Sequence, residues 1–309
     1  MSPMKLARTA AIALMVAAVF LGGFPTAFAY AATLQIVHEL GTTEVPVKPE
    51  RVVVFDFGVL ETLDEMGVPV AGVPQGNLPS HLARYGDSAY RNVGTLKDPD
   101  FEVIHNLRPD LIIISGRQAE FYEELSRLAP TIYVGVDNAN YLPSFKENMN
   151  TLAQIFGLED AMESRLADID AQIERVRQQT AGKKALMLLV TGGKASTYGP
   201  GSRYGLIYDV MGLTPAVANV VASTHGQSIS WEFVVMADPD YILVIDRDAV
   251  VSGGGNQPAQ RVVENALVRQ TRAYKEGRIT YLDPTYWYLS GGGLTSLAKM
   301  LSDIEEAMR

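Results

Sequence analysis

The chain has 309 residues, of which 47% are hydrophobic, and it carries 26 Lys and Arg against 35 Asp and Glu. Such a chain buries a large core in two domains or one large one, and its composition excludes a disordered or collagen-like protein. It has no Cys, which argues against a thiol nucleophile, a cysteine zinc site, an iron–sulfur cluster, a disulfide framework or a lipid anchor. The net charge of −9 argues against a nucleic-acid partner, because phosphate binding needs a basic surface.

The N-terminus has the pattern of an export signal. Lys5 and Arg8 precede the apolar run 10–21, which is short for a membrane span of roughly 20 residues. The small-residue pattern Ala27-Phe28-Ala29 then resembles a signal-peptidase site. We expect residues 1–29 to be a cleaved signal peptide, with a signal anchor as the alternative, and a soluble periplasmic protein without a lipid anchor. Removing Lys5 and Arg8 leaves 24 basic against 35 acidic residues, a net charge of −11.

The first half of the remaining chain alternates strand and helix patterns. Residues 51–55 predict a strand, residues 58–66 a helix that ends at Gly67, and residues 131–134 a later strand. Between them, the segment FEVIHNLRPD (101–110) predicts a short helix that Pro-Asp ends, with a buried strand after it. Strands that alternate with helices predict a parallel sheet.

One long helix is predicted in the middle of the chain. Apolar residues recur there at spacings of four and three, which places them on one helix face: Met162, Leu166, Ile169, Ile173 and Val176. The helix would be roughly 30 Å long at 1.5 Å per residue, which is a stiff connection and predicts a cleft that closes little. A coiled-coil dimer is the alternative, but the stripe is short and we expect a monomer. The predicted organisation is an N-terminal lobe (30–157), a linker helix (158–181) and a C-terminal lobe (182–309).

The second half repeats the alternation. Residues 184–190 predict a strand, residues 204–211 a helix that ends at Gly212, residues 278–282 the last strand, and residues 294–308 a closing helix. The fold class expected is therefore α/β, with two pseudo-symmetric lobes that each contain a parallel sheet.

The two halves share one unit. WEFVVMADPD (231–240) corresponds to FEVIHNLRPD, and each precedes a buried strand. Each unit has a Glu, Glu102 or Glu232, seven residues before Pro-Asp and fifteen before an Arg, Arg117 or Arg247. A Glu suits a helix N-terminus, and each Arg follows the carboxyl end of a strand, where open α/β sheets bind ligands.

These features and several motifs carry a family resemblance. The motifs are VVVFD (52–56), SGRQ (115–118), YGPGSR (198–203), HGQSI (225–229) and YLDPTYWYL (281–289). The chain resembles the helical-backbone class (class III) of periplasmic substrate-binding proteins, which deliver vitamin B12, haem and siderophores to ABC importers. Within that class it resembles the CeuE/YclQ group, which binds ferric catecholate siderophores. It departs from the pattern in the glycine-rich stretch 252–255 and in Trp231, where a small polar residue is common.

The resemblance implies two protein ligands for iron. Fe(III) prefers anionic oxygen donors, which catecholates supply, and a tetradentate catecholate leaves two of six positions open. The resemblance assigns these positions to His225 and Tyr288, as Tyr also binds iron in catalase. Spacing alone does not select Tyr288 over Tyr286. We expect no intrinsic cofactor, with Fe(III) bound as the siderophore complex.

Three arginines are candidates for binding the anionic complex. Arg117 and Arg247 occupy equivalent ends of the two units, and Arg203 lies in a Gly-Pro-Gly-Ser-Arg turn. Guanidinium groups form charge-assisted hydrogen bonds with catecholate oxygens. An Arg after a strand can instead cap a helix or pair with a carboxylate, but all three match motif positions of the resembled group.

The resemblance also implies a partner. In the wider class a Glu at this helix start in each lobe docks on Arg residues of the inner-membrane permease, which assigns this role to Glu102 and Glu232. An ordinary helix N-terminal charge is the alternative, and the two are compatible. The other three histidines, His38, His81 and His105, are expected to be solvated or core residues.

Two other functions remain as alternatives. Haem or cobalamin would bind to the same scaffold, and a His/Tyr pair also suits haem iron. An exported metallohydrolase is the alternative from another class, but the sequence has no HExxH, no GxSxG and no P-loop. We therefore expect a binding protein and not an enzyme.

Overall fold

The computed structural model describes residues 32–251 and 257–309. The predicted signal peptide (1–29) and the glycine-rich stretch 252–255 lie outside the described residues. Among the described helices, none is both long enough and apolar enough to cross a membrane.

The N-terminal sheet has the predicted parallel arrangement. Its five strands lie in the order β5-β4-β3-β6-β7, and all neighbouring pairs are parallel. The strands are β3 (Val52–Val54), β4 (Gly72–Val73), β5 (Arg91–Asn92), β6 (Leu111–Ile114) and β7 (Thr131–Tyr133). The associated helices are α1 (Phe57–Glu65), α2 (Phe101–Leu107) and α3 (Tyr122–Ser126), with a 3₁₀ turn η1 (Ser80–Gly86). β3 and β6 are fully buried, so their apolar runs belong to a sheet covered on both faces.

The C-terminal sheet is mixed, whereas a parallel sheet was expected. Its strands are β8 (Lys184–Thr191), β9 (Lys194–Tyr198), β10 (Thr214–Pro215), β11 (Gln227–Ile229), β12 (Tyr241–Asp246) and β13 (Ile279–Leu282). β8, β10, β12 and β13 pair in parallel, but β9 and β11 add an antiparallel edge. The cause is a two-residue turn at Gly192 and Gly193, whose φ angles of 55° and 73° suit a tight hairpin.

Short helices surround this second sheet. They are α6 (Leu206–Asp209), α7 (Trp231–Ala237), α8 (Asp248–Val251), α9 (Ala259–Val263) and α10 (Arg272–Lys275). The predicted helix 204–211 is therefore only one α-helical turn. Its flanks are held by other backbone bonds, including one from Gly205 to the carbonyl of Ser202.

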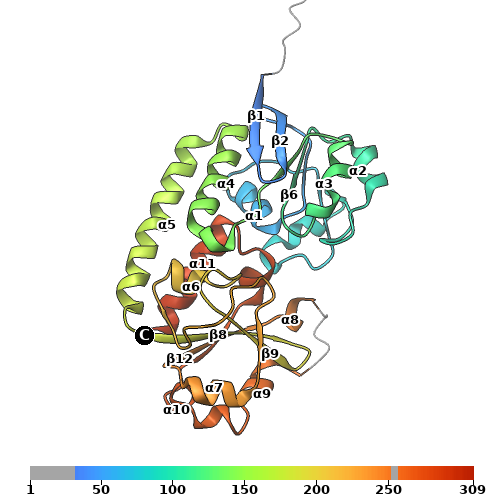
Figure 1. Cartoon of the computed structure of the whole chain (residues 1–309). Coiled ribbons are helices and arrows are strands. Elements are labelled where there is room, and N and C mark those ends of the chain that lie inside the picture. The colour runs from blue at the N-terminus through green and yellow to red at the C-terminus, as the bar shows by residue number, and fades with distance from the viewer. Residues whose placement is uncertain (1–31, 252–256) are drawn as a thin grey trace, which may run out of the picture. The chain divides into compact units, whose positions relative to one another are not determined.

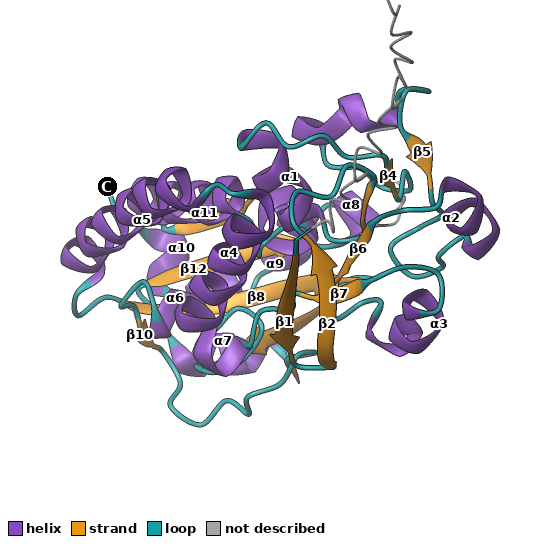
Figure 2. Ribbon diagram, turned by 90° about the horizontal axis from the view of Figure 1, so that it is seen from above, coloured by secondary structure: helices purple, strands orange, loops and turns teal. Residues whose placement is uncertain are grey.

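A hairpin at the start of the described chain was not predicted. β1 (Thr33–His38) pairs antiparallel with β2 (Gly41–Pro46), and both strands lie beside β7 (Figure 2). Half of its residues are exposed, and only Ile36 and Val45 are buried. Such a strand has little of the apolar signal that identifies a core strand.

Three long helices join the two sheets. They are α4 (Tyr141–Phe156), α5 (Glu159–Thr180) and α11 (Leu294–Ala307). α5 packs against α4 and α11, and Figure 1 shows it running past both lobes. All five apolar residues of its predicted stripe are buried. α5 lies within residues 158–181, the range predicted for the linker helix.

The repeated unit is repeated in structure as well. α2 and α7 each have seven residues, and each is followed by a residue with positive φ, Arg108 (49°) and Asp238 (35°). The Asp of each Pro-Asp pair then accepts a backbone hydrogen bond from the strand beside it. Asp110 accepts from Arg51 N at 2.9 Å, and Asp240 accepts from Lys184 N at 3.1 Å. Each Pro-Asp therefore marks the end of a helix, and its Asp fixes the start of the neighbouring strand.

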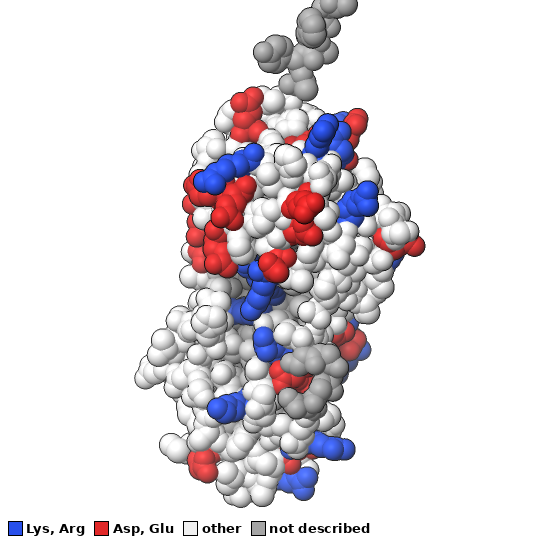
Figure 3. All heavy atoms as spheres, turned by 90° about the vertical axis from the view of Figure 1, so that its right-hand side faces the viewer, with Lys and Arg blue, Asp and Glu red and all other residues white. Residues whose placement is uncertain are grey.

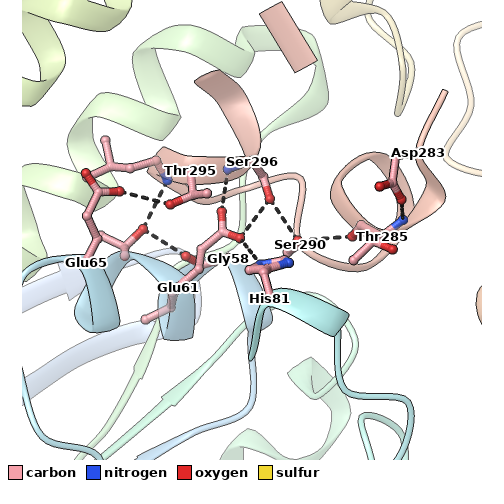
Figure 4. A network of polar contacts seen from close by, with 12 residues as sticks. Gly58, Glu61, Glu65, His81, Asp283, Thr285, Ser290, Thr295 and Ser296 are labelled. Atoms are coloured by element: carbon pink, nitrogen blue, oxygen red, sulfur yellow. Dashed lines mark hydrogen bonds and ion pairs between the residues drawn. The ribbon is translucent and has the colours of Figure 1, made fainter. Parts of the chain in front are cut away.

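A buried carboxylate connects α1 to α11. Glu61 is 2% exposed, and its carboxylate accepts hydrogen bonds from the backbone N–H and the hydroxyl of Ser296, at 2.6 and 2.9 Å. His81 lies 2.8 Å from the same carboxylate, and Ser296 contacts Ser290 (Figure 4). Gly58 allows this approach, because a Cβ there would overlap the backbone of Gly293. The contacts fix the start of α11 against α1 of the first lobe.

Candidate ligand-binding site

A cavity of about 700 Å³ lies between residues of both lobes. Its lining includes all five side chains that the sequence analysis selected for ligand binding, Arg117, Arg203, His225, Arg247 and Tyr288. Figure 3 shows basic side chains in a hollow of the molecular surface, with acidic residues on the surface above it. Four cationic side chains and one carboxylate, Asp56, are among the described residues that line the cavity. The protein is acidic, yet this cavity is basic.

Tyr288 lies at the centre of the three arginines. It belongs to a short π-helix, η5 (Thr285–Leu289), an element that often occurs at functional sites. Its backbone carbonyl accepts hydrogen bonds from Arg117 Nη2 at 2.8 Å and Arg203 Nη2 at 2.9 Å. The guanidinium carbon of Arg203 lies 4.3 Å from the centre of the Tyr288 ring. Contacts across 171 and 85 positions of the chain therefore fix this residue.

The charges around Tyr288 change its acidity. Burial alone would raise the pKa of its phenol, but the hydrogen bond from Arg247 and the charges of Arg203 and Arg247 outweigh burial and lower it. The pKa of Arg117 is also lowered, first by burial and then by the charge of Arg203. The guanidinium nevertheless stays charged, since arginine keeps its proton in proteins. The site therefore makes the Tyr288 phenol more acidic than an ordinary tyrosine.

His225 reaches the cavity from a loop of the second lobe. It lies two residues before strand β11. Its carbonyl accepts a hydrogen bond from the Tyr198 hydroxyl at 3.1 Å, and its own N–H donates to Ser223 Oγ. Gly226 follows with φ of 73°, and a Cβ there would overlap the Tyr198 ring. The turn needs glycine and places the exposed imidazole at the cavity.

Tyr286 does not line this cavity. Its ring stacks on His81, with 4.7 Å between ring centres, next to the Glu61 contacts. Burial raises the pKa of Tyr286, whereas that of Tyr288 is lowered. The geometry thus separates two tyrosines that spacing alone could not.

Sequence reasoning missed several lining residues. Lys97 projects from a tight loop whose Leu96 carbonyl accepts a hydrogen bond from the buried Gln118 amide at 2.5 Å. Asp56 caps α1 and accepts a hydrogen bond from Ser115 Oγ at 2.6 Å. Asp56, Ser115 and Gln118 all fall within the quoted motifs, so the motifs were a usable signal. Lys97 had no such signal in the sequence, because its position at the cavity depends on a loop that a distant side chain holds.

Comparison with known proteins gives a consistent result. The model of the family described as periplasmic binding protein matches residues 52–286. The chain belongs to this family. It is 46% identical over 281 residues to the petrobactin-binding protein YclQ of Bacillus subtilis, covering 89% of this chain and 88% of that protein. It is 36% identical to the ferric-anguibactin-binding protein FatB of Vibrio anguillarum, covering 87% and 85%.

Solved structures agree with this assignment. The crystal structure of YclQ superposes with a TM-score of 0.87 and 45% identity, covering 90% of this chain and 99% of that chain. The catecholate-siderophore binding protein VctP of Vibrio cholerae superposes with a TM-score of 0.85 and 35% identity, covering 89% and 100%. The predicted class III fold is thereby confirmed.

The two repeated glutamates of this periplasmic binding protein are exposed. Glu102 is the second residue of α2, behind the cap Asp100, and Glu232 is the second residue of α7, behind the cap Ser230. A backbone hydrogen bond, and then one from Ser230, lower the pKa of Glu232. Neither Glu lines the cavity. They are carboxylates at matching helix starts, one in each lobe.

The remaining histidines have other surroundings. His81 contacts Glu61 and Tyr286, and His105 is exposed on α2. His38 contacts the Thr43 hydroxyl at 3.0 Å, and burial lowers its pKa. None of the three lines the basic cavity, so each is a solvated or packed residue as expected.

Proposed function

We propose that this protein captures ferric catecholate siderophores in the periplasm and delivers them to an inner-membrane ABC importer. The observation that carries the proposal is the convergence of Arg117, Arg203 and Arg247 on one cavity around Tyr288. A ferric catecholate is anionic, and guanidinium groups bind such oxygens by charge-assisted hydrogen bonds. The names of YclQ, FatB and VctP, which refer to siderophores, support the same ligand class.

Tetradentate complexes are the favoured ligands in this proposal. Such a complex leaves two coordination positions on Fe(III), for which His225 and Tyr288 are the donors. The lowered pKa of Tyr288 supports this role, because the phenolate is the form that binds iron. An exposed imidazole on a loop has the freedom to reach the metal. Fe(III) is part of the cargo here, held by the siderophore and by the two side chains.

Titration with ferric complexes tests the proposal. The mature protein is titrated with ferric tetradentate, hexadentate and bidentate catecholates and with a cationic ferric hydroxamate. Quenching of tryptophan fluorescence reports binding, since Trp287 lines the cavity. The proposal expects catecholates to bind more tightly than the hydroxamate, and the tetradentate complex to show a shifted charge-transfer band. Equal affinity for the cationic hydroxamate would contradict it.

Delivery to the permease is proposed through Glu102 and Glu232. Both are exposed, both begin a helix of the repeated unit, and both lie outside the cavity. A carboxylate in each lobe suits a permease of two subunits that offers an Arg from each. The protein would act as a monomer in this arrangement.

A further inference from the structure

A second cavity adjoins the basic one. It measures about 420 Å³ and lies between the β1–β2 turn, the segment after β7 and the start of α4. Three consecutive residues, Tyr133, Val134 and Gly135, line both cavities. This short segment is therefore the boundary between the two spaces.

The Tyr133 ring forms the side-chain part of this boundary. A Cβ at Gly135 would overlap the phenol ring, so the ring rests where any other residue would have its side chain. The hydroxyl also approaches Gly116, where a Cβ would lie 3.7 Å from it. The ring thus fills the space between the loops that follow β6 and β7. Only glycine at position 135 permits this placement.

The boundary segment is held by α4. The Asn148 amide on α4 donates to the carbonyls of Val134 and Gly135, at 2.9 and 3.1 Å. Burial, followed by the charges of Glu39 in the β1–β2 turn and of Asp56, raises the pKa of the Tyr133 phenol to about 12. Tyr133 therefore stays a neutral phenol at neutral pH.

We propose that Tyr133 is a specificity-determining residue. Its ring separates the basic cavity from the second cavity and so limits the size of the bound complex. The inference rests on the proposed function and specifies it further. A compact tetradentate complex fits within the basic cavity, and a larger hexadentate complex meets the Tyr133 ring. Removing the ring joins the second cavity to the first and makes room for the larger complex.

The test compares Tyr133→Ala with Tyr133→Phe. Both variants lose the phenol hydroxyl, but only the Ala variant loses the ring, so the difference between them measures the effect of the ring. Dissociation constants are measured for a ferric tetradentate and a ferric hexadentate catecholate. We expect Tyr133→Ala to shift the ratio of the two dissociation constants about tenfold in favour of the hexadentate complex. Tyr133→Phe should keep the wild-type ratio.

A second truncation variant and a stated threshold make the test decisive. Tyr133→Val also removes the ring and suits the end of a strand, so it replaces the Ala variant if thermal unfolding shows that the latter is unstable. A shift of less than about threefold in the folded truncation variants, relative to Tyr133→Phe, would overturn the inference. If the wild type binds both complexes and the variants keep its ratio of dissociation constants, this inference alone is contradicted. Failure of the wild type to bind either complex would contradict the proposed function itself.

Discussion

Arg247 Nε donates a hydrogen bond to the Tyr288 hydroxyl at 2.8 Å. Arg247 directly follows β12 of the second lobe, and Tyr288 lies 41 residues later in the π-helix that bounds the cavity. A cation that donates to a phenol oxygen stabilises the phenolate, and this offsets the burial that would raise the phenol pKa. The contact with Arg247 therefore makes this partly buried phenol more acidic than an ordinary tyrosine, at a position that lines the cavity.

The first prediction concerns this oxygen. Tyr288→Phe and His225→Ala should each weaken binding of a ferric tetradentate catecholate by at least about tenfold, because each removes one of the two proposed donors to the metal. Tyr288→Phe should also shift the visible charge-transfer band, to which a phenolate–iron bond contributes. With a saturated hexadentate complex, both substitutions should have much smaller effects. Fluorescence titration and visible spectra measure the two quantities.

Tyr286→Phe is the matched control for the first prediction. It removes a phenol hydroxyl two residues away that does not line the cavity. It should leave affinity and spectrum unchanged. Unchanged affinity and spectrum for both donor variants would instead refute direct coordination and leave only electrostatic recognition.

The second prediction concerns the arginines. Arg203→Ala should weaken binding of anionic ferric catecholates about tenfold or more, because a partly buried cation is poorly screened by solvent. Binding of a neutral ferric hydroxamate should change little. Arg175→Ala on α5 is the control, since it removes an equal charge outside the cavity, beside Glu305. Equal losses in the two variants would show that net charge, and not the site, governs binding.

Local patterns predicted much of this fold. The units around Glu102 and Glu232 carry their own helix caps, Pro-Asp ends and buried strands, so a short window contains the information. β4 and β5 have two residues each, which is too short for any periodicity. The antiparallel edge had a usable signal in Gly192 and Gly193, because paired glycines between apolar runs are typical of hairpins.

The candidate site was predictable only in part. Arg117, Arg203 and Arg247 stand at motif positions, and the structure brings them to one cavity. Tyr133 could not be identified in this way, because its position depends on Gly135 beside it and on Glu39 from a distant hairpin. Such contacts arise from the packing of remote segments, which no spacing along the chain records.

The third prediction concerns delivery. The double variant Glu102→Ala, Glu232→Ala should bind ferric catecholate with wild-type affinity, because neither side chain lines the cavity. Cells that depend on it should nevertheless take up iron more slowly, since a docking contact would be lost in each lobe. Glu163→Ala removes an exposed carboxylate on α5 and serves as the control. Normal iron uptake by the double variant would rule out docking through these residues.

The last prediction concerns the buried carboxylate of Glu61. Glu61→Ala leaves the N–H of Ser296 and the ring of His81 without their acceptor, so it should cost about 3–5 kcal/mol of unfolding free energy. Glu61→Gln keeps an acceptor oxygen and should cost less. Burial raises the pKa of Glu61 above its ordinary value of 4.5 in spite of the bonds from His81 and Ser296. Between those two values the folded state binds more protons than the unfolded state, so wild-type stability should fall as pH rises through the raised value.

Urea unfolding of wild type and Glu61→Gln at a series of pH values measures this effect. The free energy of unfolding of the wild type minus that of the variant should decrease as pH rises from 4.5, because only the wild type must ionise a buried carboxyl group. Glu65→Gln, one turn later on the same helix and bonded to Thr295 and Arg165, is the matched control. A difference that stays constant across the series would contradict this prediction, because it would mean that the contacts to His81 and Ser296 fully offset the burial of Glu61.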